Sequence, residues 1–401
     1  MKADLGKRAA AAVPPRATAV ARPAADTRRR IVVIGNMLET LVWFRGPLMQ
    51  AMVAHGHEVI ALVPVPDPSS PLVARLEAMG VAVQSIFLDR TGFNPFADAY
   101  TACSLVARLR RLRPDVVLAY MIKPVIYGSI AARLAGVRAV YSMVEGAGYV
   151  FSEQENRRIS LRAAIKLMYR LALARNWRVF FLNPDDERLF ATLGLIRRPE
   201  QAVLLDGIGV DLDWFAEVPL PPELSFLLVA RFIRDKGLAE YVAAARLVKA
   251  RHPEVRFRLV GWIDDNPAAI REDELRAWVE EGIVEYLGKL DDVRPALADA
   301  SVFVLPSYYP EGLPRTIMEA MALGRPIITT DAPGCRETVI PGRNGYLVPV
   351  RDVPALAEAM LRFVEQPELI AIMGHESRRI AQAKYDVHRI NRRILEELHL
   401  V

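Results

Sequence analysis

The stretch SVFVLPSYYPEGLPRTIMEAMALGRP, residues 301–326, contains the pattern that decides the fold. Its first five residues form an apolar, strand-like run, and a loop rich in proline and glycine follows. A helix is expected to begin near Pro314, because proline is favoured in the first turn. Glu311 then lies in the loop at the mouth of this helix, and Glu319 lies about one and a half turns inside it.

The same alternation of strand and helix extends over the rest of the chain from Arg30 onward. Strands are expected at 31–35, 57–64, 81–88, 115–120, 138–143, 179–182, 202–206, 225–230, 257–261, 283–287, 301–306, 326–330 and 345–349. Helix-like stretches of 10–20 residues, such as 126–135, separate many of them, and a further helix is expected at 353–365. This alternation is typical of parallel sheets covered on both faces. We therefore predict an α/β protein of two Rossmann-like doubly wound domains. Such sheets bind ligands at the carboxyl ends of their strands.

The domain boundary is predicted from the run Pro219-Leu220-Pro221-Pro222, since proline blocks both helices and strand pairing. Gly207 and Gly209 precede it and can absorb backbone rotation. The predicted organisation is a disordered basic tail (1–29), a first domain (30–206), a hinge (207–222), a second domain (223–384) and a C-terminal helix that packs back on the first domain (385–401).

Composition excludes several classes of protein. The chain has 401 residues, 52% of them hydrophobic, so extensive disorder is excluded. No apolar run reaches the roughly 18 residues of a membrane-spanning helix. Cys103 and Cys335 cannot form a disulfide framework or a thiolate zinc site, so a reduced cytoplasmic setting is expected. The six histidines show no metal-ligand spacing, and we predict no metal.

Charge is divided unevenly along the chain. Residues 1–200 contain 28 Lys+Arg and 16 Asp+Glu, whereas residues 201–401 contain 24 and 31. The basic half suggests an anionic partner, either nucleic acid or a membrane surface. Four cations recur at every fourth residue and would form one stripe on a helix: Arg158, Arg162, Lys166 and Arg170. This stripe fits an anionic lipid surface, and it equally fits a solvated face of a helix that covers the core.

A second loop carries cations at the end of a strand. Arg231 and Lys236 follow the apolar run Leu227–Ala230, where they could meet a polyphosphate. Taken alone, this loop could be a solvated turn, Glu311 could be a capping acid and Glu319 could be solvated. Cations for phosphates and carboxylates for hydroxyls at the ends of one sheet together suggest a pocket for a nucleotide sugar.

These motifs resemble those of the retaining glycosyltransferases of family 4, which have the GT-B fold. The resemblance rests on Glu311 and Glu319 in Glu-Gly-Leu-Pro-x4-Glu-Ala-Met-Ala-x-Gly-x-Pro, on Arg231-x4-Lys236-Gly, and on the hinge-like sequence Gly207-Ile-Gly-Val-Asp-x2-Trp-Phe. It extends from about Arg30 to the C-terminus.

The resemblance implies a role for each matching residue. Arg231 and Lys236 would hold the donor diphosphate and stabilise the leaving charge, Glu311 would contact hydroxyls of the transferred sugar, and Glu319 would bind the ribose. The remaining implied donor-binding residues are Gly312, Leu313, Pro314, Arg315, Thr316, Gly35 and Asn36. The implied reaction is a metal-independent retaining transfer of a hexose or N-acetylhexosamine from a nucleotide sugar, UDP-linked in our prediction, without a cofactor.

The first domain resembles the bacterial subgroup that extends glycans on a polyprenyl-diphosphate lipid, in capsule or O-antigen synthesis. This implies a lipid-linked saccharide acceptor and a peripheral location on the anionic cytoplasmic face of the inner membrane. Lys123 and Glu145 are the polar candidates near the acceptor, although a surface carboxylate is the simpler interpretation of Glu145. Two departures stand out: Gly35-Asn36 replaces a pair of glycines, and Tyr120-Met121 stands where many members have histidine.

Three alternatives remain at this point. A nucleotide-sugar 2-epimerase of the same architecture would need other acids and histidines in the cleft. A non-catalytic scaffold that binds sugar or membrane would not need Arg231, Lys236, Glu311 and Glu319 together. A nucleic-acid partner lacks any aromatic stacking platform or recognised motif, and we predict none.

Overall fold

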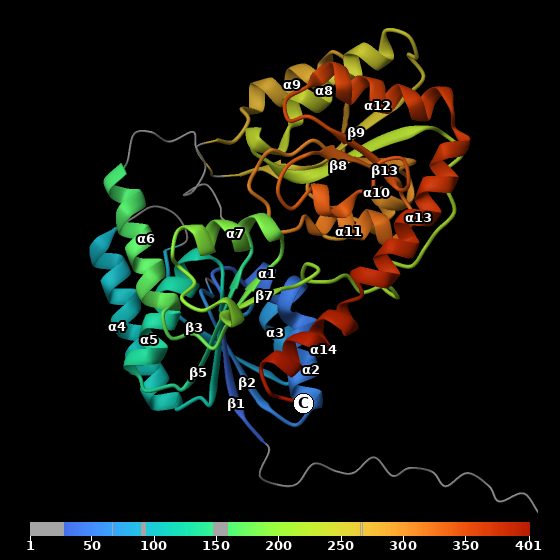
Figure 1. Ribbon diagram of the computed structural model, residues 1–401. Helices are drawn as coiled ribbons and strands as arrows, with labels where there is room; N and C mark the ends of the chain where they lie inside the picture. Colours follow the sequence, from blue (N-terminus) through green and yellow to red (C-terminus); the bar gives the residue numbers. More distant parts are fainter. Residues whose placement is uncertain (1–27, 66, 90–93, 147–158, 265, 267) are drawn as a thin grey trace, which may run out of the picture.

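The computed structural model describes residues 28–65, 67–89, 94–146, 159–264, 266 and 268–401. Within them the chain forms two parallel β-sheets, each covered by helices, and Figure 1 shows the second domain stacked above the first. Both sheets consist of parallel neighbours only. These two α/β sheets confirm the predicted fold class. The predicted basic tail falls almost entirely on residues 1–27, outside the described part.

The first sheet has the strand order β3-β2-β1-β4-β5-β6-β7. Its strands are β1 (Arg30–Ile34), β2 (Glu58–Val63), β3 (Val81–Ser85), β4 (Val116–Tyr120), β5 (Ala139–Val144), β6 (Arg178–Phe181) and β7 (Ala202–Leu204). Its helices are α1 (Leu38–Thr40), α2 (Gly46–Ala54), α3 (Pro71–Ala78), α4 (Pro95–Leu112), α5 (Ser129–Leu134), α6 (Ile159–Leu173) and α7 (Pro184–Thr192). Two π-helical turns, η1 (Leu41–Arg45) and η2 (Pro124–Gly128), precede α2 and α5, and the short 3-10 turn η4 (Pro199–Gln201) precedes β7.

The central strand β1 shows why this sheet is buried on both faces. Ile31 and Val33 belong to the same buried cluster as Met49 of α2. Val32 and Ile34 point to the opposite face, in the cluster that contains helices α4 and α5. Figure 1 accordingly shows α2 and α3 on one side of the sheet and α4, α5 and α6 on the other. Because every residue of the run is covered, the strand is continuously apolar.

The second sheet has the order β10-β9-β8-β11-β12-β13. Its strands are β8 (Ser225–Phe232), β9 (Arg256–Ile263), β10 (Glu285–Tyr286), β11 (Val302–Leu305), β12 (Ile327–Thr330) and β13 (Gly345–Val348). Its helices are α8 (Leu238–Lys249), α9 (Glu272–Glu280), α10 (Arg294–Ala298), α11 (Arg315–Ala322), α12 (Val353–Glu365) and α13 (Glu368–Lys384), with 3-10 turns η5 (Arg234–Lys236) and η6 (Arg336–Thr338). The direction of winding reverses between β8 and β11, which makes their carboxyl ends the expected ligand site.

Two details of the secondary structure differ from the sequence prediction. The expected strand at 283–287 is reduced to the two residues of β10, which pairs only with β9 at the edge of the sheet. Helix α7 was not predicted, although Asn183 caps its N-terminus, Pro184 occupies its first turn, and three acidic residues follow. These are ordinary signals for a helix start.

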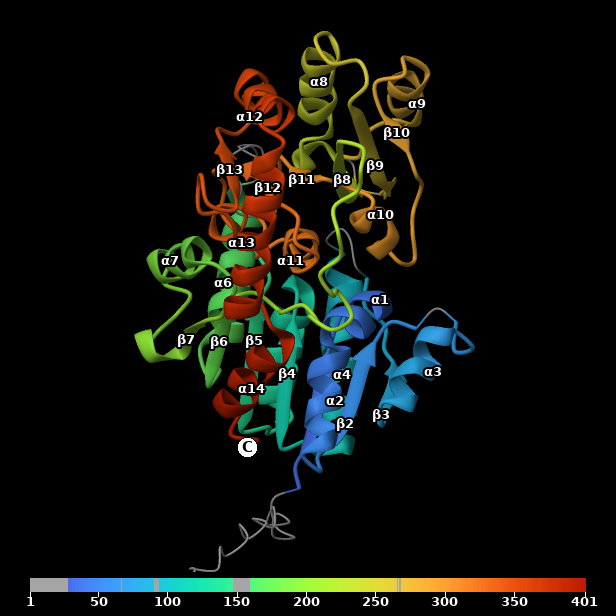
Figure 2. The same cartoon turned by 90° about the vertical axis from the view of Figure 1, so that its right-hand side faces the viewer.

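The chain crosses between the domains twice, and the two crossings lie side by side. Val210 donates from its amide to the Tyr385 carbonyl at 2.8 Å, and Val387 donates to the Val210 carbonyl at 3.1 Å. Gly209 makes this approach possible, because a Cβ there would lie 2.6 Å from Cα of Val387. The last helix, α14 (Val387–Glu397), then packs against α2 of the first domain. Figure 2 shows α13 and α14 descending from the upper domain to the lower one.

Candidate active site

The candidate site lies at the carboxyl ends of β8 and β11. Beyond β8 the chain turns through η5, and beyond β11 it forms the loop that leads into α11. The two turns interlock, because the amides of Tyr308 and Tyr309 both donate to the Asp235 carbonyl, at 2.8 and 3.0 Å. The loop of Glu311 and the turn of Lys236 are thereby fixed to each other.

Lys236 and Glu311 form an ion pair at this edge of the sheet. The Lys236 ammonium contacts Oε1 of Glu311, which also accepts a hydrogen bond of 3.1 Å from the Ser307 hydroxyl. Both side chains are nearly buried, at 11% and 12% exposure. The ammonium lies 5.4 Å from the centre of the Tyr309 ring. The cation predicted to bind the diphosphate and the carboxylate predicted to contact the sugar therefore neutralise each other in this structure.

Arg231 lies within β8 and not in the loop that follows it. Its Nη1 donates to Oδ2 of Asp264 at 2.8 Å, and the side chain is 38% exposed. Arg234, which has no assigned role, pairs with Glu274 at 2.9 Å. Arg231 and Lys236 therefore lie at the same edge of the sheet. The side chain of Arg231 is the more exposed to solvent of the two.

Glu319 is buried in α11 and pairs with Arg315 one turn earlier, at 2.7 Å. Burial raises the pKa of Glu319, and the nearby Arg315 opposes that shift. The Arg315 guanidinium also donates to the Trp43 carbonyl and lies 4.7 Å from the centre of the Phe44 ring. One arginine therefore connects the proposed ribose-binding acid to the first domain.

The other proposed donor-binding residues divide between the two domains. Gly312, Leu313 and Pro314 are buried where the loop enters α11, and Thr316 is half-buried in its first turn. Across the domain boundary, Gly35 ends β1 against the Tyr120 ring, leaving no room for a Cβ. The Asn36 Oδ1 is buried with no hydrogen-bond partner within the described residues.

Glu145 corrects a sequence interpretation. It is not a surface carboxylate: its side chain is only 10% exposed and pairs with the buried Arg45. Burial lowers the pKa of Arg45 to about 10. The backbone of Glu145 also touches the donor loop, since a Cβ on Gly312 would lie 2.7 Å from the Glu145 carbonyl carbon. A buried pair in the first domain thus lies directly against the loop of Glu311.

Lys123 is likewise buried, and its ammonium pairs with Asp98 at 2.9 Å. Desolvation and the neighbouring Asp98 raise the pKa of Tyr127, on the next turn.

Of the basic stripe, Arg158 lies outside the described residues. Arg162 and Lys166 are half-buried and Arg170 is exposed on α6, at the outer side of the first domain in Figure 1. Leu167 and Leu171 beside them are 58% and 49% exposed.

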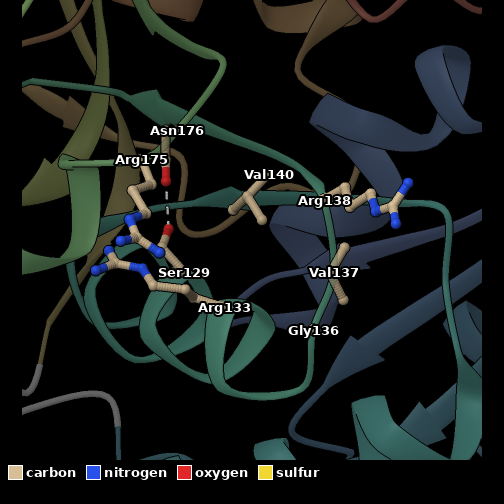
Figure 3. Close-up of a pocket in the computed structure, with 8 residues that line it drawn as sticks. All are labelled: Ser129, Arg133, Gly136, Val137, Arg138, Val140, Arg175 and Asn176. Atoms are coloured by element: carbon tan, nitrogen blue, oxygen red, sulfur yellow. Dashed lines mark hydrogen bonds between the residues drawn. The ribbon is translucent and has the colours of Figure 1, made fainter.

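A hollow of about 300 Å³ lies at the opposite edge of the first sheet, where β5 begins. Figure 3 shows Arg133 and Arg175 pointing toward each other there, beside Ser129 and Asn176, while Arg138 points away. Burial, and then the nearby Arg175 and Arg197, lower the pKa of Arg133. This hollow is remote from the ends of β8 and β11 and takes no part in the candidate site.

Two residues at the site were missed by sequence reasoning about chemistry. Neither Arg45 nor Asn183 was assigned a chemical role from the sequence. Asn183 is fully buried, and its side chain reaches the carbonyls of Glu311 and Gly312. The contact spans 128 residues of sequence, and only the cap signal before α7 could have drawn attention to it.

Two facing parallel α/β domains, with paired cations and carboxylates at the switch point of the second, define a glycosyltransferase of the GT-B architecture. The family model "Glycosyl transferase 4-like domain" matches residues 43–207, and "Glycosyl transferases group 1" matches residues 223–366. Together they span well over half of the chain. The chain therefore belongs to the family 4 glycosyltransferases, which confirms the resemblance and removes the epimerase alternative.

The chain is similar to curated relatives over most of its length. It is 25% identical to N,N'-diacetylbacillosaminyl-diphospho-undecaprenol alpha-1,3-N-acetylgalactosaminyltransferase of Campylobacter jejuni, over 92% of this chain and 97% of that protein. It is 26% identical to the Escherichia coli UDP-Gal:alpha-D-GlcNAc-diphosphoundecaprenol alpha-1,3-galactosyltransferase, over 70% of this chain and 74% of that one.

Solved structures share the fold. Anabaena HepE in complex with UDP superposes with a TM-score of 0.73 at 18% identity, covering 93% of this chain and all of that one. Sucrose-phosphate synthase of Thermosynechococcus elongatus gives 0.75 at 22% identity, covering 92% and 98%. In the described part of the chain, no helix is both long and apolar enough to cross a membrane.

Proposed function

We propose that this glycosyltransferase moves a hexose or N-acetylhexosamine from a UDP-sugar to a saccharide carried on a polyprenyl diphosphate. The names of the two curated relatives support the acceptor, since each contains a diphospho-undecaprenol saccharide. One of those names also contains UDP-galactose, and the HepE structure contains UDP. With such an acceptor, we propose that the reaction takes place at the cytoplasmic face of a bacterial inner membrane, in the synthesis of a surface polysaccharide.

The Lys236–Glu311 pair carries this proposal. Each charge is already held by the other in a nearly dry setting, so neither side chain needs to be rearranged over a long distance to meet a ligand. A donor diphosphate would take the ammonium as its counter-ion, and the Glu311 carboxylate would then accept hydrogen bonds from sugar hydroxyls. Opposite charges fixed before the reaction stabilise a leaving group strongly, because they need no reorganisation.

The remaining roles follow from position. Arg231 lies at the same strand end and adds a second fixed cation. Glu319 accepts hydroxyl hydrogen bonds only when ionised, and Arg315 favours that form against the effect of burial. We propose that these two cations supply the electrostatic stabilisation without a metal or cofactor, and that the acceptor attacks the same face from which the phosphate leaves, which retains the anomeric configuration.

Membrane contact is proposed for the outer face of α6. Lys166 is half-buried and Arg170 is exposed on this helix, and the exposed Leu167 and Leu171 flank them. Cations beside exposed apolar side chains suit the headgroup region of an anionic bilayer.

The proposal is tested with the purified full chain and a panel of UDP-, GDP- and ADP-sugars. We expect UDP to raise the thermal midpoint and at least one UDP-sugar to be consumed when lipid-linked saccharide is added. Lys236→Ala should weaken UDP binding at least tenfold, because it removes a charge-assisted contact worth more than 1.4 kcal/mol. Arg234→Ala is the matched control, since it removes a cation from the same turn that pairs elsewhere. Preference for GDP- or ADP-sugars, or an unchanged UDP titration of Lys236→Ala, would contradict the proposal.

A further inference from the structure

Asn183 links the two domains through its side-chain amide. It follows β6 in the first domain and is fully buried. Its Nδ2 lies 2.9 Å from the carbonyl oxygen of Glu311 and 2.8 Å from that of Gly312, both in the second domain. The same nitrogen lies 2.8 Å from Oδ2 of Asp186.

The orientation of this amide is determined by its surroundings. Nδ2 has three oxygen acceptors around it, whereas Oδ1 accepts a hydrogen bond from the Asp186 amide at 2.8 Å. Turning the group over would place its oxygen against two carbonyls and a carboxylate, and its NH2 against an N–H donor. Asn183 therefore acts as a donor toward the second domain while its oxygen caps α7.

The carbonyls that Asn183 holds belong to the loop of the proposed catalytic carboxylate. That loop is also packed tightly against the turn after β5: a Cβ on Gly146 would lie 2.6 Å from the Pro310 carbonyl oxygen. The Glu311 side chain is held by groups of the second domain, Lys236 and Ser307. Its backbone is held from the first domain.

We propose that Asn183 is a positioning residue, through which the first domain holds the Glu311–Gly312 backbone and completes the donor site only when the domains are closed on each other as in this structure. This inference rests on the proposed function of Glu311. The proposed phosphate and ribose contacts, Lys236 and Glu319, lie in the second domain alone. Loss of the Asn183 donor should therefore lower turnover more than it lowers donor affinity.

The competing explanation is that Asn183 only caps α7. Asn183→Ser separates the two roles, because serine retains N-cap ability but cannot reach with an NH2 group. Asn94→Ser is the matched control. Asn94 also precedes a proline and caps a long helix, α4, by accepting from the amides of Phe96 and Ala97 at 3.1 and 3.3 Å. Within the described residues, the hydrogen bonds of the Asn94 side chain stay inside the first domain.

The test compares both variants in steady-state kinetics and in hydrogen exchange of peptides that span residues 309–316. For Asn183→Ser we expect kcat to fall at least tenfold, KM for the donor to change less than twofold, and the loop amides to exchange faster. Its thermal midpoint should fall below that of Asn94→Ser, because buried acceptors lose their donor, so both variants are assayed well below their midpoints. Misplacement of a reacting group by a fraction of an ångström is sufficient for such a loss.

Two results would overturn the inference. One is unchanged kcat in Asn183→Ser. The other is a fall in kcat with loop exchange identical to that of wild type, since the loss would then not arise from this contact. If wild type consumes no donor at all, the proposed function fails instead. Hydrogen exchange still tests the contact between Asn183 and the loop in that case. Faster exchange of the loop amides in Asn183→Ser supports the inference that Asn183 holds the loop in place, and unchanged exchange rejects it.

Discussion

Lys236 and Glu311 carry opposite charges in a setting from which water is almost excluded, with 11% and 12% of their side chains exposed. Such a pair is costly to break from one side, because the remaining charge stays buried without compensation, a loss of about 3–5 kcal/mol. The pair therefore holds both side chains in place at this sheet edge. It also means that a substitution at either position affects both stability and chemistry.

A conservative substitution of Glu311 can separate its proposed role in transfer from its effect on the stability of the fold. Glu311→Gln keeps the size of the side chain and one acceptor oxygen but removes the charge. We expect transfer to fall about 100-fold, as for the loss of one fixed electrostatic contact in other active sites. The measurement is kcat at a temperature well below the midpoint, with circular dichroism to verify the fold.

A double variant provides the control. Lys236→Met with Glu311→Gln leaves no unpaired charge and should recover most of the thermal midpoint without recovering transfer. Glu274→Gln removes a carboxylate from the more exposed pair with Arg234 and should leave transfer unchanged. Near-normal turnover of Glu311→Gln would remove this residue from the catalytic machinery.

The sequence predicts which residues lie together along one edge of a sheet. It does not predict which residues of different domains lie close to each other. Arg231 lies at the end of one strand, and Lys236, Glu311 and Glu319 follow strands of the same sheet. The alternation of strands and helices therefore predicts that these residues share an edge. The ion pair between Lys236 and Glu311 could be recognised only from the structure. Arg45, Glu145 and Asn183 reach the site from the other sheet, and no local pattern records the distance between two domains.

At the scale of single elements, α6 offers a test of the membrane proposal. Lys166→Glu with Arg170→Glu reverses two cations on its outer face, and we expect the protein to be released from vesicles that contain anionic lipid. Each cation near an anionic surface contributes about 1 kcal/mol, so reversing two should lower the partition coefficient well over tenfold. Vesicle sedimentation at fixed ionic strength measures the change.

Arg392→Glu with Arg393→Glu makes the same charge change on α14, where both side chains are exposed, and should retain binding. Equal loss in both double variants would point to the overall charge of the domain and not to α6. Unchanged sedimentation of the α6 variant would reject the membrane contact.

Helices and strands were predicted best where the spacing of apolar residues agrees with the residues that cap or end the element. The run 353–365 was expected as a helix and is α12, with Asp352 as its cap. The helix expected over 126–135 begins instead with the π-helical turn η2 at Pro124, before α5. Within α6, Ile165 and Tyr169 are buried against the core, whereas Leu167 and Leu171 are exposed.

At the scale of the whole molecule, the first domain includes the last residues of the chain. Deleting residues 387–401 should destabilise that domain, because α14 buries Ile390, Ile394 and Leu395. Three such side chains contribute about 1.5–3 kcal/mol each, which is comparable to the total stability of a small domain. The deletion also removes the 2.9 Å contact between Nε2 of His57 and the Leu400 carbonyl.

We expect the deleted chain to lose its cooperative thermal transition for the first domain, or to lower its midpoint by more than 10 °C, as measured by calorimetry. Removal of Val401 alone, which is 57% exposed, is the control and should have no effect. A deleted chain that melts like the full chain would show that α14 is dispensable.

The returning α14 also has a consequence for synthesis. Ribosomes add about 5–20 residues per second, and about 180 residues separate the end of β7 from the start of α14. The earlier domain must therefore wait roughly 10–40 s for its closing helix. Throughout that interval the nascent polypeptide exposes the α2 surface that α14 later covers, which makes this surface a target for chaperones during translation.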